Sequence, residues 1–186
     1  MHILKGTKTL GFIAHPRTGS QSTRLAFQKL GCESPGGHHG IDVEACQGIL
    51  ESGGIVYSTV RNPFDVIVSW YYYSHENVKR PANQPITPFT DWVHHLIEEG
   101  DRWVQVRWLE NGLFFGAKHC NWHIRYEQDI QLQTNVLLVY CGLPTITLPR
   151  RGATERGPYQ MMYNCDTKKL VQRTFEEDLR EWGYTF

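Results

Sequence analysis

The 186-residue chain has no excess charge of either sign, because 19 lysine and arginine residues are balanced by 19 aspartate and glutamate residues. A protein that holds nucleic acid on a broad basic face normally carries an excess of positive charge. We therefore expect no nucleic-acid partner, and any anion site has to be local. The sequence also has no apolar run close to the roughly 20 residues that a membrane-spanning helix needs, so no membrane span is predicted.

Paired cysteines and a secretion signal are missing as well. The five cysteines are an odd number without paired spacing, which argues against a disulfide framework and favours a reducing compartment. The first residues, 1–6, lack the apolar core of a signal peptide. Together these absences predict a cytoplasmic protein.

Metal-ligand spacing is also absent. Cys32 with His38 and His39, and the run His119-Cys120-x-x-His123, bring together residue types that bind zinc. Neither set has the paired spacing of a structural zinc site. We therefore expect no metal.

What the chain does have is an alternation of short apolar runs and helical patterns over the length of one domain, 1–186. Strands are predicted at 10–14, 55–60 and 122–126, and helices at 24–30, 42–52, 64–74, 89–99, 131–141 and 166–182. Strands separated by helices indicate an α/β fold with a central, mainly parallel sheet in three α/β/α layers.

The stretch from His15 to Thr23 lies between the first predicted strand and the first predicted helix. It is a tight loop of small hydroxyl residues with one glycine, Gly19, and one arginine, Arg17. A strand, a tight loop and a helix start together direct backbone N–H groups and the positive end of the helix dipole at an anion. The stretch predicts a phosphate cradle, which we call the cradle, and a P-loop-like fold.

The cradle departs from the phosphate loop of nucleotide kinases. That loop reads G-x-x-x-x-G-K-[ST], and residues 11–18 fit it only with Pro16 for glycine and Arg17 for lysine. A kinase also needs an acidic residue at the end of a neighbouring strand to hold magnesium. Here the strand 55–60 is followed by Arg61, a cation that suits a second phosphate. An atypical P-loop kinase stays open as an alternative.

Arg61 and Ser69 form the second candidate site. Arg61 offers a bidentate charged fork, and Ser69 offers a hydroxyl about two turns into the helix that Asn62 and Pro63 begin. The alternative is an ion pair between Arg61 and Asp65 that caps the helix, with Ser69 packed in it.

Together the two sites resemble the sulfotransferases that use 3′-phosphoadenosine 5′-phosphosulfate (PAPS), in particular their compact carbohydrate-type branch. The family motif P-K-T-G-[GST]-[ST]-[ST], which binds the 5′-phosphosulfate, corresponds to residues 16–22, with Arg17 in place of the lysine. The motif R-[ND]-P-x(5)-S-x-Y, which binds the 3′-phosphate, corresponds to residues 61–71. The ending 175–186 is also similar. The resemblance implies transfer of a sulfuryl group from PAPS to an acceptor hydroxyl on a glycan.

The resemblance also implies which residues bind PAPS. They are the cradle, the second motif and a late basic loop that closes over the nucleotide: Arg17, Thr18, Gly19, Ser20, Gln21, Ser22, Thr23, Arg61, Ser69, Arg151 and Gly152. Arg156, in the same late loop, either touches PAPS or an anionic acceptor or belongs to a solvated basic turn. Glu127 resembles a structural acidic residue of the family.

In-line transfer needs a base for the acceptor hydroxyl and a cation for the leaving phosphate. In the resembling branch a histidine between the two motifs is the base, which implies His39 here, with His38 as the second choice. An unshifted histidine titrates near pH 6.5, close to the range a base requires. Arg17 is expected to neutralise the leaving phosphate, and His15 to order the loop.

A second class of function stays open beside the enzyme. Arg17 in place of the lysine and the small size of the chain also fit a module that binds PAPS or a related nucleotide without turnover.

Overall fold

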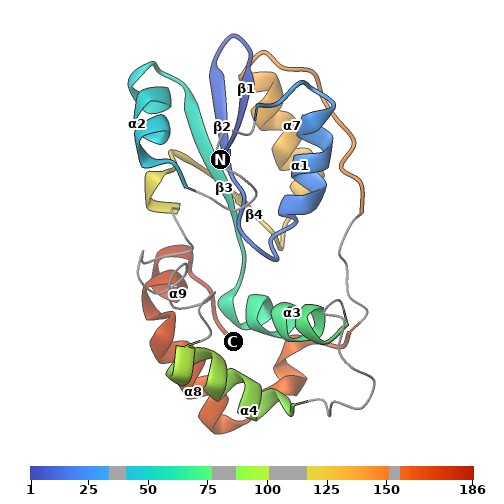
Figure 1. Ribbon diagram of the computed structural model, residues 1–186, viewed down its shortest axis with the longest axis vertical. Coiled ribbons are helices and arrows are strands. Elements are labelled where there is room, and N and C mark those ends of the chain that lie inside the picture. The colour runs from blue at the N-terminus through green and yellow to red at the C-terminus, as the bar shows by residue number, and fades with distance from the viewer. Residues whose placement is uncertain (34–40, 77–86, 101–116, 151–155) are drawn as a thin grey trace. The chain divides into compact units, whose positions relative to one another are not determined.

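The computed structural model describes residues 1–33, 41–76, 87–100, 117–150 and 156–186. The chain falls into two compact units, the first comprising Met1–Arg61 with Phe114–Ala153 and the second Asn62–Leu113 with Thr154–Phe186 (Figure 1). The boundary between Arg61 and Asn62 cuts the second predicted motif. No helix within the described ranges is long and apolar enough to cross a membrane.

The first unit is built on a four-stranded sheet whose order is β1-β2-β3-β4. The strands are β1 (His2–Lys5), β2 (Thr9–Ile13), β3 (Ile55–Val60) and β4 (Trp122–Arg125). Strands β2, β3 and β4 are parallel, and β1 is antiparallel to β2. The predicted α/β class with a mainly parallel sheet is confirmed. The first strand, β1, was not predicted from the sequence.

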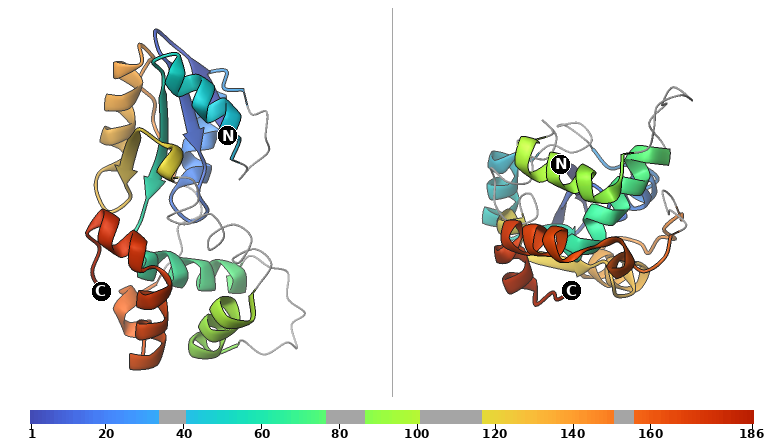
Figure 2. Two further views of the ribbon diagram at one scale, coloured as in Figure 1. Left: turned by 90° about the vertical axis from the view of Figure 1, so that its left-hand side faces the viewer. Right: turned by 90° about the horizontal axis from the view of Figure 1, so that it is seen from below.

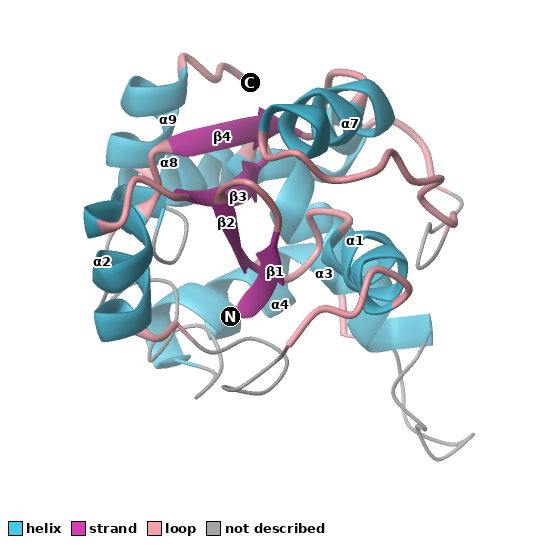
Figure 3. Ribbon diagram, turned by 90° about the horizontal axis from the view of Figure 1, so that it is seen from above, coloured by secondary structure: helices cyan, strands magenta, loops and turns pink. Residues whose placement is uncertain are grey.

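Helices cover both faces of this sheet, an arrangement compatible with three α/β/α layers. Helices α1 (Ser20–Gln28) and α7 (Ile130–Tyr140) lie on one face and α2 (Val43–Glu51) on the other (Figure 3). The cause is the alternation of side chains along the strands. Phe12 and Tyr57 pack toward α1 and α7, whereas Ile13 and Val56 pack toward α2. A short 3₁₀ helix, η3 (Ala117–His119), precedes β4.

The second unit is helical in its described part (Figure 2). Its elements are α3 (Pro63–Glu76), α4 (Phe89–His94), the π-helix η1 (His95–Gly100), the 3₁₀ helix η4 (Tyr159–Met162), α8 (Cys165–Thr174) and α9 (Glu176–Trp182). The tail was predicted as one helix over 166–182, and this is wrong at Phe175. The buried Phe175 ends α8 in the core of the unit, and three acidic residues in the first turn favour a new helix.

The helix starts follow the capping residues that the sequence offers. The carboxylate of Asp42 accepts the N–H of Ala45 at the start of α2. The side-chain oxygen of Asn62 accepts the N–H of Phe64 at 3.1 Å, with Pro63 in the first turn of α3. The predicted starts of both helices are therefore confirmed.

Candidate functional site

The connection between β2 and α1 contains two residues with left-handed backbone geometry. Gly19 has φ 78° and Arg17 has φ 62°. Glycine adopts this conformation without strain, but another L-residue pays about 1–2 kcal/mol for it. Arg17 is the only non-glycine residue with positive φ in the described part of the chain. Strain of this kind concentrates at functional sites, so the cradle is a candidate site on structural grounds.

Buried side chains hold the cradle in this shape. The hydroxyl of Thr18 donates to the backbone carbonyl of His15 at 3.0 Å, and both side chains are buried. The backbone N–H of Thr23 donates to the carbonyl of Gly19 at 3.2 Å, which closes the first turn of α1. The fold around His15 is compatible with the loop-ordering role that the sequence suggested for it.

The start of α1 is suited to an anion. The first N–H groups of a helix have no intrahelical acceptor, and Gly19, the N-cap residue, has no side chain to satisfy them. The first turn of α1 also has no acidic residue. The positive end of the helix dipole therefore meets no competing carboxylate within its own first turn.

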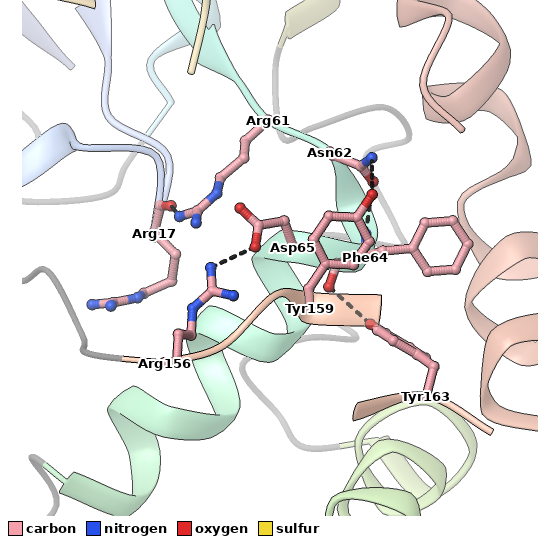
Figure 4. A network of polar contacts seen from close by, with 8 residues as sticks. All are labelled: Arg17, Arg61, Asn62, Phe64, Asp65, Arg156, Tyr159 and Tyr163. Carbon is pink, nitrogen blue, oxygen red and sulfur yellow. Dashed lines mark hydrogen bonds and ion pairs between the residues drawn. The ribbon is translucent and has the colours of Figure 1, made fainter. Parts of the chain in front are cut away.

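Arg61 lies immediately after β3 and reaches the cradle. Its guanidinium donates to the backbone carbonyl of Arg17 at 2.5 Å (Figure 4). The same guanidinium stacks over the ring of Tyr126, 3.8 Å from the ring centroid. Arg61 is buried, with 5% of its surface exposed. It therefore joins the loop after β2 to the end of β4 within the first unit.

Tyr126, expected from the sequence only as the end of a strand, is a further residue of this site. Its backbone N–H donates to the carbonyl of Val60 at 2.9 Å, one residue past the end of β4. A Cβ atom on Gly19 would lie 3.7 Å from a ring carbon of Tyr126. The ring thus lies against Gly19 as well as under Arg61. Its position at the end of a predicted parallel strand is the signal that could have identified it.

These groups gather at one edge of the sheet. The parallel strands β2, β3 and β4 end there, and the cradle, Arg61 and Tyr126 follow them in turn. Open α/β sheets bind their ligands outside the carboxyl ends of the strands. Two arginines and a helix N-terminus make this edge a candidate anion site.

The other predicted site residues lie either in the second unit or outside the described residues. Ser69 is buried in α3, in the second unit. His38, His39, Arg151 and Gly152 lie outside the described residues. Their predicted roles stay predictions.

Asp65, the alternative partner of Arg61, is bonded to Arg156 in the second unit. The guanidinium of Arg156 and the carboxylate of Asp65 form an ion pair in which both side chains are largely buried, 12% and 16% exposed (Figure 4). Asp65 lies in the first turn of α3, where the helix dipole also favours its charge. Arg156 therefore does not belong to a solvated turn.

Further hydrogen bonds fix the start of α3 within the second unit. The amide of Asn62 donates to the hydroxyl of Tyr159 and to the carbonyl of Thr185. The hydroxyl of Tyr163 donates to the carbonyl of Phe64 at 2.9 Å. Burial raises the pKa of Tyr163, so its hydroxyl stays a neutral donor at physiological pH.

The histidine and cysteine set near β4 is engaged in other contacts. The Nε2 atom of His123 lies 3.1 Å from the carbonyl oxygen of Ala117. Burial raises the pKa of the Cys120 thiol to about 12, which disfavours the thiolate that zinc requires. Across the described ranges, no group of three or more histidine, cysteine, aspartate or glutamate side chains is placed to hold a metal.

No protein-family model matches the chain, and no curated protein is found to be similar to it. The function is therefore argued from the site and from the two sequence motifs.

Proposed function

We propose that the chain is a PAPS-dependent sulfotransferase that transfers a sulfuryl group from PAPS to a hydroxyl of a glycan. The observation that carries this proposal is the cradle. A strained Arg17 and a glycine N-cap precede α1 there, and Arg61 from the neighbouring strand bonds to the Arg17 carbonyl. Two cations and a helix start suit a ligand with more than one phosphate group.

The residues of the first unit fit the 5′ end of the nucleotide. The N–H groups at the start of α1 and the Arg17 side chain would hold the 5′-phosphosulfate, as in a P-loop-like fold. By resemblance to the family's second motif, we assign Arg61 and Ser69 to the 3′-phosphate. Each hydrogen bond from a charged donor contributes about 1.5–3 kcal/mol, so the guanidinium groups dominate the affinity.

The reaction exchanges one sulfur–oxygen bond for another. The acceptor hydroxyl attacks the sulfur as the bond to the 5′-phosphate oxygen breaks, and the 3′,5′-bisphosphate leaves. His39, or His38 as the second choice, takes the hydroxyl proton. Arg17 and the N–H groups of α1 stabilise the charge that grows on the leaving phosphate.

The proposal is tested by transfer of labelled sulfate from PAPS to a panel of glycans, phenols and tyrosyl peptides. We expect transfer to a glycan, and a fall in the rate of about 10²–10⁴-fold in His39→Ala, because a general base contributes that much. Affinity for the desulfated product should not change in this variant. Undiminished transfer by His39→Ala would remove His39 as the base.

Two other outcomes identify the alternative functions. Tight binding of the 3′,5′-bisphosphate without transfer to any acceptor would show a binding module. Stabilisation by Mg-ATP but not by the 3′,5′-bisphosphate in a thermal-shift assay would show an atypical kinase. The kinase is disfavoured because Arg61 follows β3 where a magnesium-holding carboxylate is needed.

A further inference from the structure

Helix α7 has an apolar face that the first unit does not bury. Its inner residues Leu137 and Leu138 are fully buried in the core of the sheet. Its outer residues are exposed: Leu132 by 60%, Val136 by 52%, Val139 by 61% and Tyr140 by 53%. Their spacing of four, seven and eight residues places them in one stripe along the helix. We call these four residues the α7 stripe.

The α7 stripe stands out from the rest of the described surface. It contains four of the seven large apolar side chains that are exposed in the described residues. Apolar groups gathered in one patch on a soluble domain mark an interaction site, whereas single exposed ones need no explanation. Figure 3 shows α7 on the outer side of the sheet, with the strands on its inner side.

Charge indicates what kind of partner the stripe fits. The eleven residues of α7, Ile130–Tyr140, include no charged side chain. A helix that lies on a membrane surface carries lysine and arginine beside its apolar face, and α7 has none. A second copy of the same neutral helix meets no like charge, so the stripe is complementary to itself.

The ends of α7 favour an antiparallel pair. Glu127 and Asp129 are exposed at its N-terminal end. Lys8 lies at its C-terminal end, with the ammonium group 5.3 Å from the ring centroid of Tyr140. In an antiparallel pair the acidic end of one helix meets the basic end of the other. The two helix dipoles are then also opposed, which is favourable.

Pairing through the outer side of β4 is less available. The side-chain amide of Gln133 donates to the carbonyl of Arg125 and accepts the N–H of Arg125, both at 3.0 Å. The outward N–H and C=O groups of Arg125, the last residue of β4, are therefore not free to bind another strand. This shortens the part of the β4 edge that another strand could use, whereas the whole α7 stripe is exposed.

We propose that the α7 stripe is the interface of a homodimer in which two α7 helices pack antiparallel about a twofold axis near Val136. Such an interface is isologous, because the same residues contribute from both copies. A patch of a few hundred Å² is smaller than the roughly 800 Å² per partner of a stable interface. The dimer is therefore weak and forms at micromolar or higher concentration. This inference does not depend on the sulfotransferase proposal.

Sedimentation velocity of the full chain over a range of concentrations tests the dimer. We expect the wild-type sedimentation coefficient to rise with concentration and that of Val136→Glu to stay at the monomer value. Mixing Val136→Glu with Val136→Lys should restore association, because unlike charges then meet at the axis. Met161→Glu, at an 80% exposed apolar residue away from α7, should behave as wild type.

A second variant keeps the test valid if a charge at position 136 impairs folding. Val136→Cys, in a chain with Cys165→Ser, should form a disulfide-linked dimer when oxygen with copper phenanthroline oxidises the two thiols. Met161→Cys in the same background should stay monomeric on a non-reducing gel. A wild-type chain that remains monomeric at about 1 mM, or equal crosslinking at the two positions, would overturn the proposal.

Discussion

Arg17 carries a backbone strain that its neighbours compensate. The left-handed conformation turns the Arg17 carbonyl toward the guanidinium of Arg61, which donates to it. A hydrogen bond from a charged donor contributes about 1.5–3 kcal/mol, enough to offset strain of about 1–2 kcal/mol. Because the guanidinium of Arg61 donates to this carbonyl, its position depends on the shape of the cradle.

Two variants separate this strain from the charge of Arg17. Arg17→Ala and Arg17→Gly both remove the guanidinium, but only glycine adopts a positive φ without strain. We expect Arg17→Gly to be more stable than Arg17→Ala by about 1 kcal/mol in urea denaturation. Both should lose affinity for the 3′,5′-bisphosphate by the same factor. An alanine variant as stable as the glycine variant would contradict the left-handed conformation.

At the scale of elements, the ion pair between Arg156 and Asp65 ties the segment before η4 to the first turn of α3. Removal of one partner from a largely buried pair leaves the other charge poorly solvated. We expect Arg156→Met to lower the free energy of unfolding by about 1–3 kcal/mol, as measured in urea. Arg173→Met, at an exposed position of α8, is the matched control and should change it by less than about 0.5 kcal/mol. Equal effects of the two substitutions would refute a structural role for the pair.

Local patterns in the sequence predicted most of the elements. The β-branched run of β3 and the caps at Asp42 and Asn62 led to correct predictions because they act within a few residues. The strand β1 was missed because four residues give little pattern and its partner, β2, stabilises it. The break at Phe175 was missed because tertiary packing, not a local breaker, produces it.

The candidate site was predictable in part for the same reason. The cradle and Arg61 were recognisable because each belongs to a contiguous motif. Tyr126 was not recognised, since its contact with Arg61 joins residues 65 positions apart. The partner of Asp65 was also missed, because Arg156 is 91 positions away in the sequence. Contacts of that range depend on the fold and not on local spacing.

At the scale of the whole molecule, thiols that are partly or fully buried make the free energy of unfolding fall at alkaline pH. Burial raises the pKa of Cys120 from 9.0 to about 12. Between these two pH values the thiol of Cys120 stays protonated in the folded chain but is ionised in the unfolded chain. The stability from this group is complete below pH 9 and is lost as the pH rises toward 12. Burial raises the pKa values of Cys46 and Cys141 in the same direction.

We therefore expect the free energy of unfolding to fall as the pH rises above about 9. Cys120→Ala should show a shallower fall, because this variant has one titrating thiol fewer. Cys165→Ala, at an exposed cysteine, is the control and should keep the wild-type slope. Urea denaturation at a series of pH values measures both. If the free energy of unfolding of Cys120→Ala falls with pH as steeply as that of the wild type, the Cys120 thiol is not the cause of the pH dependence.

The chain as a whole is neutral, so local groups and not a broad basic surface would have to recognise the proposed nucleotide. We propose that these groups recognise two phosphates, one at the 5′ and one at the 3′ position. Calorimetric titration with 3′-phosphoadenosine 5′-phosphate and with adenosine 5′-phosphate, without magnesium, tests this claim most directly. We predict that the bisphosphate binds at least about tenfold more tightly, since its 3′-phosphate adds charged hydrogen bonds. Equal affinity for the two nucleotides would contradict the account.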